Sequence, residues 1–562
     1  MVKENPENSS PFSPSIDPRS GFCSKTQIFH SLRLSASLPP ETTPLSFTSY
    51  FFSLLRHHPT TTAAFIDGAT RHRILHSELQ LRVKSLAFCI HQEIGLSKGD
   101  CAFVLAPNSP EIPVLFLSLF SFGVIVCPSN PANSVLEISE QVNLSKPLIA
   151  FTTHDLAQKL PSFLRHRTVL LDSPEFISWM LKNGNDCNSL DFQFSEIYQS
   201  DTAAILFSSG TTGRFKGVEL THKNFISAVA GSNAARPARQ KPPVILCTVP
   251  FFHIYGFLMS IRDVAFGATM ISMKKFDFRL MMRIVEEIKA THLALAPPAV
   301  VLMVNNADLM SEFDLSSLEV VLCAGAPLAN AVIERFRRRF PNAAVAQAYG
   351  LTETTGGATR TLPGESQRLG TVGRLVSDCQ AKIVDPDSDN DKGLTPLRPG
   401  ELWIRGPSVM KGYLADKEAT DATLNQDGWL RTGDICYFDN EGFLFYVDRI
   451  KELIKYKAYQ IAPAELEHLL LSHPDITNAA VIPYPDEEAG EVPVAFVVRK
   501  SGSSIDEESI IQFIARQVSP YKKIRKVFFI NSIPTNAPGK VLRKELINLV
   551  RSSSSSSSSS KL

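Results

Sequence analysis

A loop rich in hydroxyl groups and glycine, with a lysine beside it, is the stretch of this chain best suited to binding phosphate. The apolar run from Ala203 to Phe207 precedes it and predicts a short buried strand. Gly210 and Gly213 allow tight bends that turn successive amide N–H groups toward an anion. Lys216 adds a mobile positive charge. The hydroxyl donors predicted to contact phosphate are Ser208, Ser209, Thr211 and Thr212.

This loop is not a Walker A loop, because Gly213 is followed by Arg-Phe-Lys-Gly and not by Gly-Lys-Ser or Gly-Lys-Thr at the required spacing. A different class of nucleotide site is therefore predicted. An ordinary polar turn between a strand and a helix explains a single loop of this kind about equally well. The other motifs must decide between this turn and a nucleotide site.

A second motif, Gln347 to Thr354, places an aromatic ring, hydroxyl groups and a carboxylate together after an apolar run. Tyr349 could stack on a purine and Thr352 could donate to a phosphate. Glu353 could hold Mg²⁺ that bridges phosphate oxygens. For this motif alone, an ordinary turn capped by threonine remains the alternative.

Charged groups suited to a nucleotide follow later in the chain. Asp434 ends a Gly-rich turn, where its carboxylate can accept two ribose hydroxyls. Lys540 follows a Pro-Gly turn that can hold it away from its domain. A basic cluster that could face phosphates consists of Arg449, Lys451, Lys455 and Lys457. Each feature could be an ordinary solvated surface, but their joint occurrence in one order is much less probable by chance.

From Ser46 onward, strand-like apolar runs alternate with helical patterns, which predicts an α/β fold with doubly wound layers. Strands are predicted at Cys101 to Ala106, Thr168 to Leu171, Val244 to Val249, His292 to Ala296 and Val320 to Ala324. Helices are predicted at Leu280 to Ala290, Ala329 to Phe340 and Ala464 to Ser472, and Pro463 suits the first turn of the last of these. Ligands of such folds bind in the loops that follow the strands.

Four segments are predicted. Residues 1–45 are rich in Ser, Pro and Thr and form an irregular or partly ordered lead-in, and residues 46–447 form a large N-terminal domain. The latter ends in a small β-rich part after Gly370, where short strands are separated by Asp, Gly and Pro. Residues 448–550 form a smaller α+β domain, and residues 551–562 form a serine-rich tail.

Composition narrows the function classes. A formal net charge of +1 and the lack of basic runs disfavour a nucleic-acid partner. Nine cysteines without a Cys-x-x-Cys pair argue against a disulfide framework and a zinc site. The longest apolar stretch, Val114 to Cys127, is too short to span a bilayer, so no transmembrane segment is predicted. The terminal Ser560-Lys561-Leu562 predicts a peroxisomal location and a peroxisomal import receptor as partner.

Together, these motifs resemble the adenylate-forming superfamily of acyl-CoA synthetases, 4-coumarate:CoA ligases and beetle luciferases, from about Phe47 to Val550. Residues 208–217 look like its first signature, and Gly400 to Gly406 looks like its second, which we interpret as structural. Phe252-His-Ile-Tyr255 is most similar to the plant 4-coumarate:CoA ligase-like branch. The resemblance implies a large N-terminal domain of two doubly wound α/β layers plus a small β-barrel, with a mobile α+β C-terminal lid.

The resemblance also implies roles for individual residues. Lys540, His253, Lys455 and Glu353 are the expected catalytic residues, and Glu353 is also the expected metal ligand. Further ATP or adenylate contacts are implied for Gln347, Ala348, Tyr349, Thr352, Asp434, Arg449, Lys451 and Gln460. The acyl group is expected at Tyr255, Gly256 and Ala326, with His253 facing the same pocket, and CoA is expected at Lys275, Lys457 and Ala458. Gly256 and Ala326 are small, which suggests space for a ring or a bulky chain. Ala348 and Ala458 stand where these ligases usually have glycine, and each adds a methyl group where a ligand approaches the backbone.

The implied activity is a two-step ligation of a carboxylic acid to CoA, driven by ATP with Mg²⁺. Hydroxycinnamate-type acids, fatty acids and jasmonate-precursor acids are all open as substrates. Three alternatives remain at this stage: a luciferase-like adenylating oxygenase, a module that loads a carrier protein, and a non-catalytic adenylate-binding homologue. Retention of Lys216, Glu353, Asp434, Arg449 and Lys540 together argues against the last of these.

Overall fold

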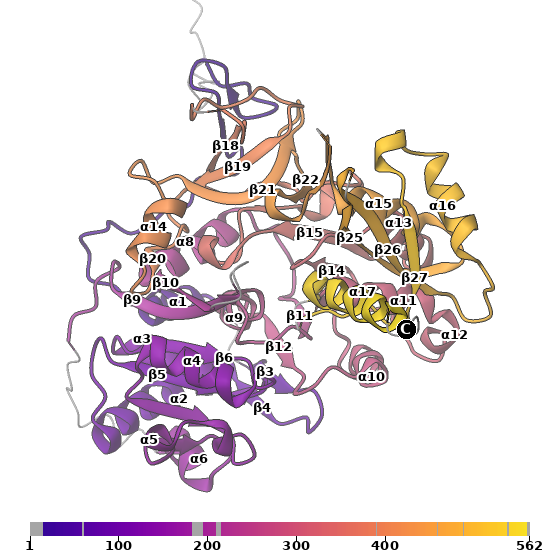
Figure 1. Cartoon of the computed structure of the whole chain (residues 1–562). Helices are drawn as coiled ribbons and strands as arrows, with labels where there is room; N and C mark the ends of the chain where they lie inside the picture. Colours follow the sequence, from indigo (N-terminus) through magenta and orange to yellow (C-terminus); the bar gives the residue numbers. More distant parts are fainter. Residues whose placement is uncertain are drawn as a thin grey trace, which may run out of the picture.

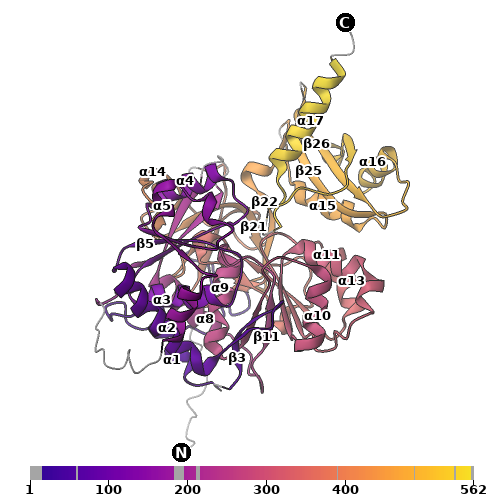
Figure 2. The same cartoon turned by 90° about the horizontal axis from the view of Figure 1, so that it is seen from below.

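The computed structural model describes residues 15–58, 61–182, 195–209, 215–388, 390–457, 459–486, 488–536 and 539–558. Four sheets organise this part of the chain (Figure 1). Three of them build a large body, and the fourth belongs to a C-terminal unit that stands to one side of it (Figure 2). In the described residues, no helix combines the length and the apolar character that crossing a membrane requires.

The first sheet has seven strands in the order β20-β10-β9-β6-β5-β7-β8. Their bounds are β5 Cys101–Leu105, β6 Ile125–Ser129, β7 Ile149–Thr152, β8 Thr168–Leu170, β9 Thr202–Ser209, β10 Phe215–Thr221 and β20 Gly412–Tyr413. The helices of this part of the body are α1 Phe47–Leu55, α2 His76–Cys89, α3 Glu111–Ser121, α4 Val135–Ser145, α5 Ser162–Arg165, α6 Pro174–Leu181 and α8 His222–Ala234, and a π-helical turn, Ile90–Ile94, extends α2. β5, β6, β7 and β8 run parallel, as their continuous apolar sequences predict.

The second sheet has nine strands in the order β17-β16-β15-β14-β13-β11-β12-β3-β4. Their bounds are β3 Ala63–Asp67, β4 Arg73–Leu75, β11 Val244–Cys247, β12 Thr269–Ser272, β13 His292–Leu295, β14 Val320–Cys323, β15 Ala344–Tyr349, β16 Thr359–Arg360 and β17 Arg374–Leu375. Its helices are α9 Ile254–Arg262, α10 Phe278–Ile288, α11 Pro297–Asn305, α12 Ala307–Met310 and α13 Asn330–Arg339. Local sequence sets where they begin: the Asp277 side chain accepts a hydrogen bond from the Leu280 amide at the start of α10.

The third sheet has six strands in the order β1-β2-β18-β19-β21-β22, in the part of the chain where the sequence predicts a small β-rich unit and the family resemblance implies a small β-barrel. Their bounds are β1 Phe22–Cys23, β2 Ile28–His30, β18 Gln380–Val384, β19 Gly400–Arg405, β21 Leu430–Phe438 and β22 Leu444–Arg449, with α14 Lys417–Thr423 beside them. β2 pairs with β18, so the lead-in segment contributes strands to this sheet. The sequence did not predict these two strands, because each is too short to show the alternation of apolar and polar residues that marks a strand.

The C-terminal unit is α+β, as predicted. Its sheet has the order β24-β23-β26-β25, with β27 pairing with β26. The elements are β23 Ile454–Tyr456, β24 Tyr459–Ile461, α15 Pro463–Ser472, β25 Ile476–Asp486, β26 Gly490–Arg499, α16 Glu507–Ala515, β27 Lys526–Phe529 and α17 Arg543–Ser558. Figure 2 shows α17 projecting away from the body. Short 3₁₀ helices complete the chain at Ala157–Lys159, Val264–Phe266, Thr352–Thr354, Pro363–Glu365, Ile450–Glu452 and Pro520–Lys522.

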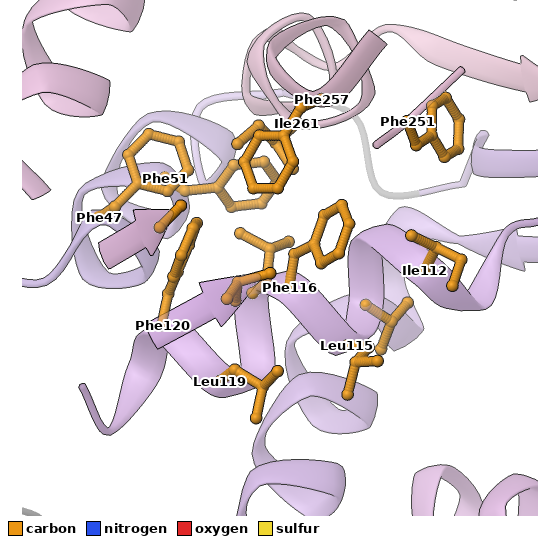
Figure 3. Packing of buried hydrophobic residues seen from close by; sticks show 14 of the residues in the cluster. Phe47, Phe51, Ile112, Leu115, Phe116, Leu119, Phe120, Phe251, Phe257 and Ile261 are labelled. Atoms are coloured by element: carbon orange, nitrogen blue, oxygen red, sulfur yellow. The ribbon is translucent and has the colours of Figure 1, made fainter. Parts of the chain in front are cut away.

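An aromatic cluster holds the body together (Figure 3). Phe47, Phe120, Phe225 and Phe257 are fully buried, and they come from α1, α3, α8 and α9. Phe116 stacks on Phe257 with ring centroids 4.5 Å apart. Burying rings from four helices at one point fixes α9, whose first turn carries the predicted acyl-site residues. The eight cysteines of the described residues are free and buried.

Candidate active site

A cavity of about 470 Å³ lies between the body and the C-terminal unit. The body contributes the start of α11, the loop after β14, the end of β15, the middle of β21 and the end of β22. The C-terminal unit contributes α15 and the loop before α17. The predicted site residues on its wall are Ala326, Ala348, Tyr349, Asp434, Arg449 and Lys540. Residues more than two hundred positions apart in the sequence therefore meet at one cavity.

A buried trio of polar groups forms one wall. The Tyr349 hydroxyl donates to Asp434 Oδ2 at 2.6 Å, and Arg449 Nε lies 3.5 Å from Asp434 Oδ1. Asp434 and Arg449 are Cα partners across β21 and β22, so the sheet register fixes their approach. Burial raises the pKa of Asp434 to about 6, against the lowering effects of Arg449 and Tyr349. An ionised Asp434 is an acceptor for ligand hydroxyls.

Lys540 enters the same cavity from the C-terminal unit. Its Nζ lies 3.7 Å from Glu452 Oε1, and Glu452 Oε2 accepts from Arg543 Nη1 at 2.7 Å. Burial lowers the pKa of Lys540, and Arg449 lowers it further, while Glu452 and Asp434 raise it. The preceding Gly539 has φ +87°, and a Cβ there would lie 2.9 Å from Pro298 Cδ. Only glycine therefore lets this loop bring Lys540 against α11 without strain.

The phosphate loop and the second motif meet at one tyrosine. Lys216 Nζ lies 4.3 Å from the centroid of the Tyr413 ring, and the Tyr413 hydroxyl donates to Glu353 Oε1 at 2.9 Å. Lys216 and Ser208 are Cα partners across β10 and β9. Among the described residues, no hydrogen bond engages Glu353 Oε2. The chemistry of one carboxylate with a free oxygen fits Mg²⁺, which takes one or two protein carboxylates plus substrate phosphates.

Four predicted loop residues, Gly210, Thr211, Thr212 and Gly213, lie outside the described residues, as do Ala458 and the terminal tripeptide at 560–562. Ser209 ends β9. Thr352 begins the 3₁₀ turn that carries Glu353. Gln347 Nε2 donates to the Thr371 carbonyl at 3.0 Å.

A second cavity, of about 230 Å³, lies on the other side of β15. Apolar and small residues from α8, α9, β14 and the turn after the 3₁₀ helix supply much of its wall, including Ala228, Leu258, Met259, Leu322, Gly356 and Gly357. Tyr255 lines it too, and its hydroxyl donates to the Leu322 carbonyl at 2.9 Å. Ala348 borders both cavities. This second space suits an apolar ligand group beside a polar nucleotide site.

Two predicted acyl-site residues have other positions. His253 caps α9, where Nδ1 accepts from the Tyr255 amide at 3.3 Å, and burial lowers the pKa of His253 to about 4. Gly256 was expected to leave space for a bulky chain, but a Cβ there would collide with the Pro250 carbonyl oxygen. Gly256 is therefore small because the backbone packs against it, and the cavity space comes from Gly356 and Gly357.

The remaining predicted lysines and Gln460 are solvent-exposed. Lys455 and Gln460 are Cα partners in the β23–β24 hairpin, and Lys457 occupies the turn between these strands with φ +52°. Lys451 lies in the preceding 3₁₀ turn, and Lys275 lies on the loop after β12. Within the described residues, all five side chains stand outside the walls of both cavities.

Sequence reasoning missed several charged residues at these cavities. Glu452 organises Arg449, Lys540 and Arg543, although it lies inside the basic segment that the sequence singled out. Arg33, Arg262 and Arg360 line the second cavity from three distant segments. None of these three arginines belongs to a motif, so the sequence held no local signal for them.

Comparison with known proteins agrees with this geometry. The sequence pattern of a family described as AMP-binding enzyme matches residues 51–414, and that of the AMP-binding enzyme C-terminal domain matches residues 465–540. The chain is 46% identical over 550 residues to 4-coumarate--CoA ligase-like 9 of Arabidopsis thaliana, which covers 95% of the chain and 97% of that relative. It is 45% identical over 552 residues to the peroxisomal OPC-8:0-CoA ligase 1 of the same plant, covering 96% and 99%.

Solved structures share the fold over most of the chain. ATP-bound MatB from Rhodopseudomonas palustris superposes with a TM-score of 0.80 at 25% identity, covering 90% of this chain and 99% of that one. The o-succinylbenzoate CoA synthetase MenE from Bacillus subtilis, in complex with its acyl-adenylate intermediate, gives a TM-score of 0.74 at 26% identity, covering 88% and 97%.

Proposed function

This chain belongs to the AMP-binding enzyme family, and on that premise we propose that it is an ATP-dependent carboxylic acid:CoA ligase. The observation that carries the proposal is the convergence of Tyr349, Asp434, Arg449 and Lys540 on one cavity, with a largely apolar cavity across β15. Names of relatives also support it, because both relatives described above are named as CoA ligase-like or CoA ligase proteins.

In the first step, an oxygen of the substrate carboxylate attacks the α-phosphorus of ATP, the bond to the β-phosphate oxygen breaks, and pyrophosphate leaves. Asp434 accepts hydrogen bonds from the ribose, and the ring of Tyr349 lies beside the adenine. Lys540 offsets the negative charge that gathers as two anions meet. Mg²⁺, held by Glu353 and the ATP phosphates, supplies further positive charge when bound. The serine and threonine hydroxyls of the 208–212 loop and Lys216 hold the phosphates.

In the second step, the CoA thiolate attacks the acyl carbonyl carbon, and AMP leaves with the bridging oxygen. We propose that residues 448–550 act as a lid that turns about Asp448 between the steps. Exposure of Lys455, Lys457 and Gln460 supports this, because the hairpin stands away from the cavity while Lys540 occupies it. Turning the lid exchanges the Lys540 loop for the hairpin, and Lys457, Ala458 and Lys275 then contact CoA.

The proposed acyl site is the cavity that Tyr255 borders, with His253 fixing the start of α9 and Ala326 near the junction with the nucleotide. Hydroxycinnamate-type, fatty and jasmonate-precursor acids are the substrate classes to test. The proposed location is the peroxisome, reached through its import receptor, which the Ser-Lys-Leu tripeptide at 560–562 and the name of one relative support. Fluorescent fusions with and without this tripeptide test the location.

The activity test measures AMP, pyrophosphate and thioester produced by the purified protein from each acid class with ATP, Mg²⁺ and CoA. Equal amounts of AMP and thioester from one class are expected. Formation of AMP without a thioester would contradict the CoA ligase proposal. Light emission would then indicate an adenylating oxygenase, and an acyl group attached to a carrier protein would indicate a carrier-loading module. Binding of ATP with no product from any class would contradict catalysis altogether.

A further inference from the structure

Five arginines line the second cavity, which otherwise has largely apolar walls. Three of them are paired with carboxylates: Arg33 with Glu365 at 2.5 Å, Arg239 with Glu319 at 2.6 Å, and Arg262 with Asp263 at 2.7 Å. A fourth, Arg236, is exposed and stacks on the Phe266 ring at 4.7 Å. These four need nothing from a ligand, because solvent or a carboxylate already balances each charge.

Arg360 differs from the other four. Among the described residues, no carboxylate lies within ion-pair distance of its guanidinium, and its one hydrogen bond is a long one, 3.4 Å from Nη2 to the Ser232 carbonyl. Burial lowers the pKa of Arg360 to about 10, and the nearby Arg262 and Arg33 lower it further, while Asp263 and Glu365, which lie beyond ion-pair distance, raise it. The Arg360 side chain is partly buried. Without a carboxylate in direct contact such a cation is costly, and an anion placed beside it recovers much of that cost.

The position of Arg360 relates it to the reacting centre. It lies on β16, where its Cα partner on β15 is Ala348, the residue that borders both cavities. Gly357 also borders the cavity, and a Cβ built there meets nothing within 4 Å, so open space lies in front of this turn. Apolar side chains such as Leu258 and Met259 complete the wall.

Given the proposed ligase function, we propose that the acid substrate carries a second carboxylate, remote from the reacting one, and that Arg360 binds it. A guanidinium can form two parallel hydrogen bonds with a carboxylate, which a ketone or hydroxyl cannot match. The apolar wall takes the chain or ring between the two carboxylates. The substrate class is therefore a dicarboxylic acid with an apolar spacer, activated at the end nearer the nucleotide.

The test compares matched acids as substrates of the full-length protein. Hexanoate, octanoate, decanoate and dodecanoate are each measured beside two acids of the same length. One is the α,ω-diacid, and the other is an oxo acid whose second polar group is an uncharged ketone. Cinnamate is measured beside 4-carboxycinnamate. At the best length we expect kcat/KM for the diacid to exceed that for the monoacid by about tenfold or more. Arg360→Met should lower the diacid value by about 10- to 100-fold and leave the monoacid value within a few-fold.

Arg374→Met is the matched control. Arg374 is the Cα partner of Arg360 on β17, but it stacks on Phe443 at 4.4 Å and stands outside the wall of the second cavity. Arg374→Met should keep the preference for the diacid. Arg360→Lys should keep part of it, because the positive charge remains while the guanidinium that can form two parallel hydrogen bonds is lost. Preference for the monoacid or keto acid at every length would overturn the proposal, as would equal losses for both acids in Arg360→Met.

A binding measurement separates this proposal from the ligase proposal. Calorimetry of each diacid with the wild type and with Arg360→Met, in the presence of a non-hydrolysable ATP analogue, requires no turnover. Weaker diacid binding in Arg360→Met, without weaker monoacid binding, supports the anion site even if no acid yields a thioester. Equal diacid binding by both proteins would overturn the anion site even if the ligase activity is demonstrated.

Discussion

Replacement of Lys540 by alanine should block the first half-reaction and spare the second. The loop before α17 places Lys540 in the cavity with Asp434 and Arg449, and its Nζ lies 3.7 Å from Glu452 Oε1. A unit charge about 4 Å from a reacting anion contributes up to about 4 kcal/mol at an effective dielectric constant of about 20. Loss of one such preorganised donor typically costs about 10²- to 10³-fold in rate, which agrees with that upper bound.

Two single-turnover assays check this division. Rapid-quench release of pyrophosphate measures adenylation, and thioester formation from supplied acyl-adenylate and CoA measures transfer. We expect about a 10²- to 10³-fold loss in the first assay and a change of a few-fold in the second. Lys500→Ala, which removes an exposed lysine from the same unit, should change neither rate. Equal losses in both assays for Lys540→Ala would refute the reasoning that this lysine serves only one conformation of the lid.

Three further predictions concern the nucleotide pocket, the lid loop and the core. Burial raises the pKa of Asp434 to about 6, so the carboxylate becomes protonated below about pH 6 and no longer accepts two hydrogen bonds. The affinity for adenosine, measured by calorimetry, should therefore fall by up to about tenfold per pH unit in that range. Asp434→Asn should abolish this pH dependence, and a pH dependence that persists in the variant would contradict the assignment. Gly539→Ala should slow pyrophosphate release by about tenfold, because it adds left-handed strain and a 2.9 Å contact, whereas Gly502→Ala, with φ +82° and nothing within 4 Å, should leave that rate unchanged. Phe257→Ala should lower the free energy of unfolding, measured in urea, by about 3–5 kcal/mol, because the ring is fully buried. Phe163 is 58% exposed, so Phe163→Ala should change this free energy by less than about 0.5 kcal/mol. Similar values for the two variants would contradict the packing described.

Much of the fold follows from local sequence patterns. The run at His292–Leu295 is apolar on both faces and forms a central parallel strand, as its composition predicts. The helix at Pro463–Ser472 begins at the proline that the sequence marks. The strands at Phe22–Cys23 and Ile28–His30 are too short to show alternation, and their pairing with β18 depends on residues about 350 positions away. Such pairing leaves no local signal.

The site divides in the same way. Residues inside contiguous motifs, such as Tyr349 and Asp434, could be assigned to a nucleotide from their neighbours in sequence, and they meet at one cavity. Gly256 was misread, because a small residue signals close packing as readily as open space. Arg33 and Arg360 belong to no motif, and they become neighbours only after β2 and β16 have joined their sheets. The direction in which a charged side chain points, and the group with which it pairs, depend on the tertiary structure and leave no pattern in the local sequence.

The most direct test of the central claim follows an oxygen atom. The acid is labelled with ¹⁸O in its carboxylate and turned over once with ATP and CoA, and the AMP is examined by mass spectrometry. The account predicts that one labelled oxygen appears in AMP and none in pyrophosphate, because the attacking carboxylate oxygen remains on the α-phosphorus when the thiolate displaces AMP. Unlabelled AMP beside newly formed thioester, or label in released phosphate, would contradict an acyl-adenylate intermediate.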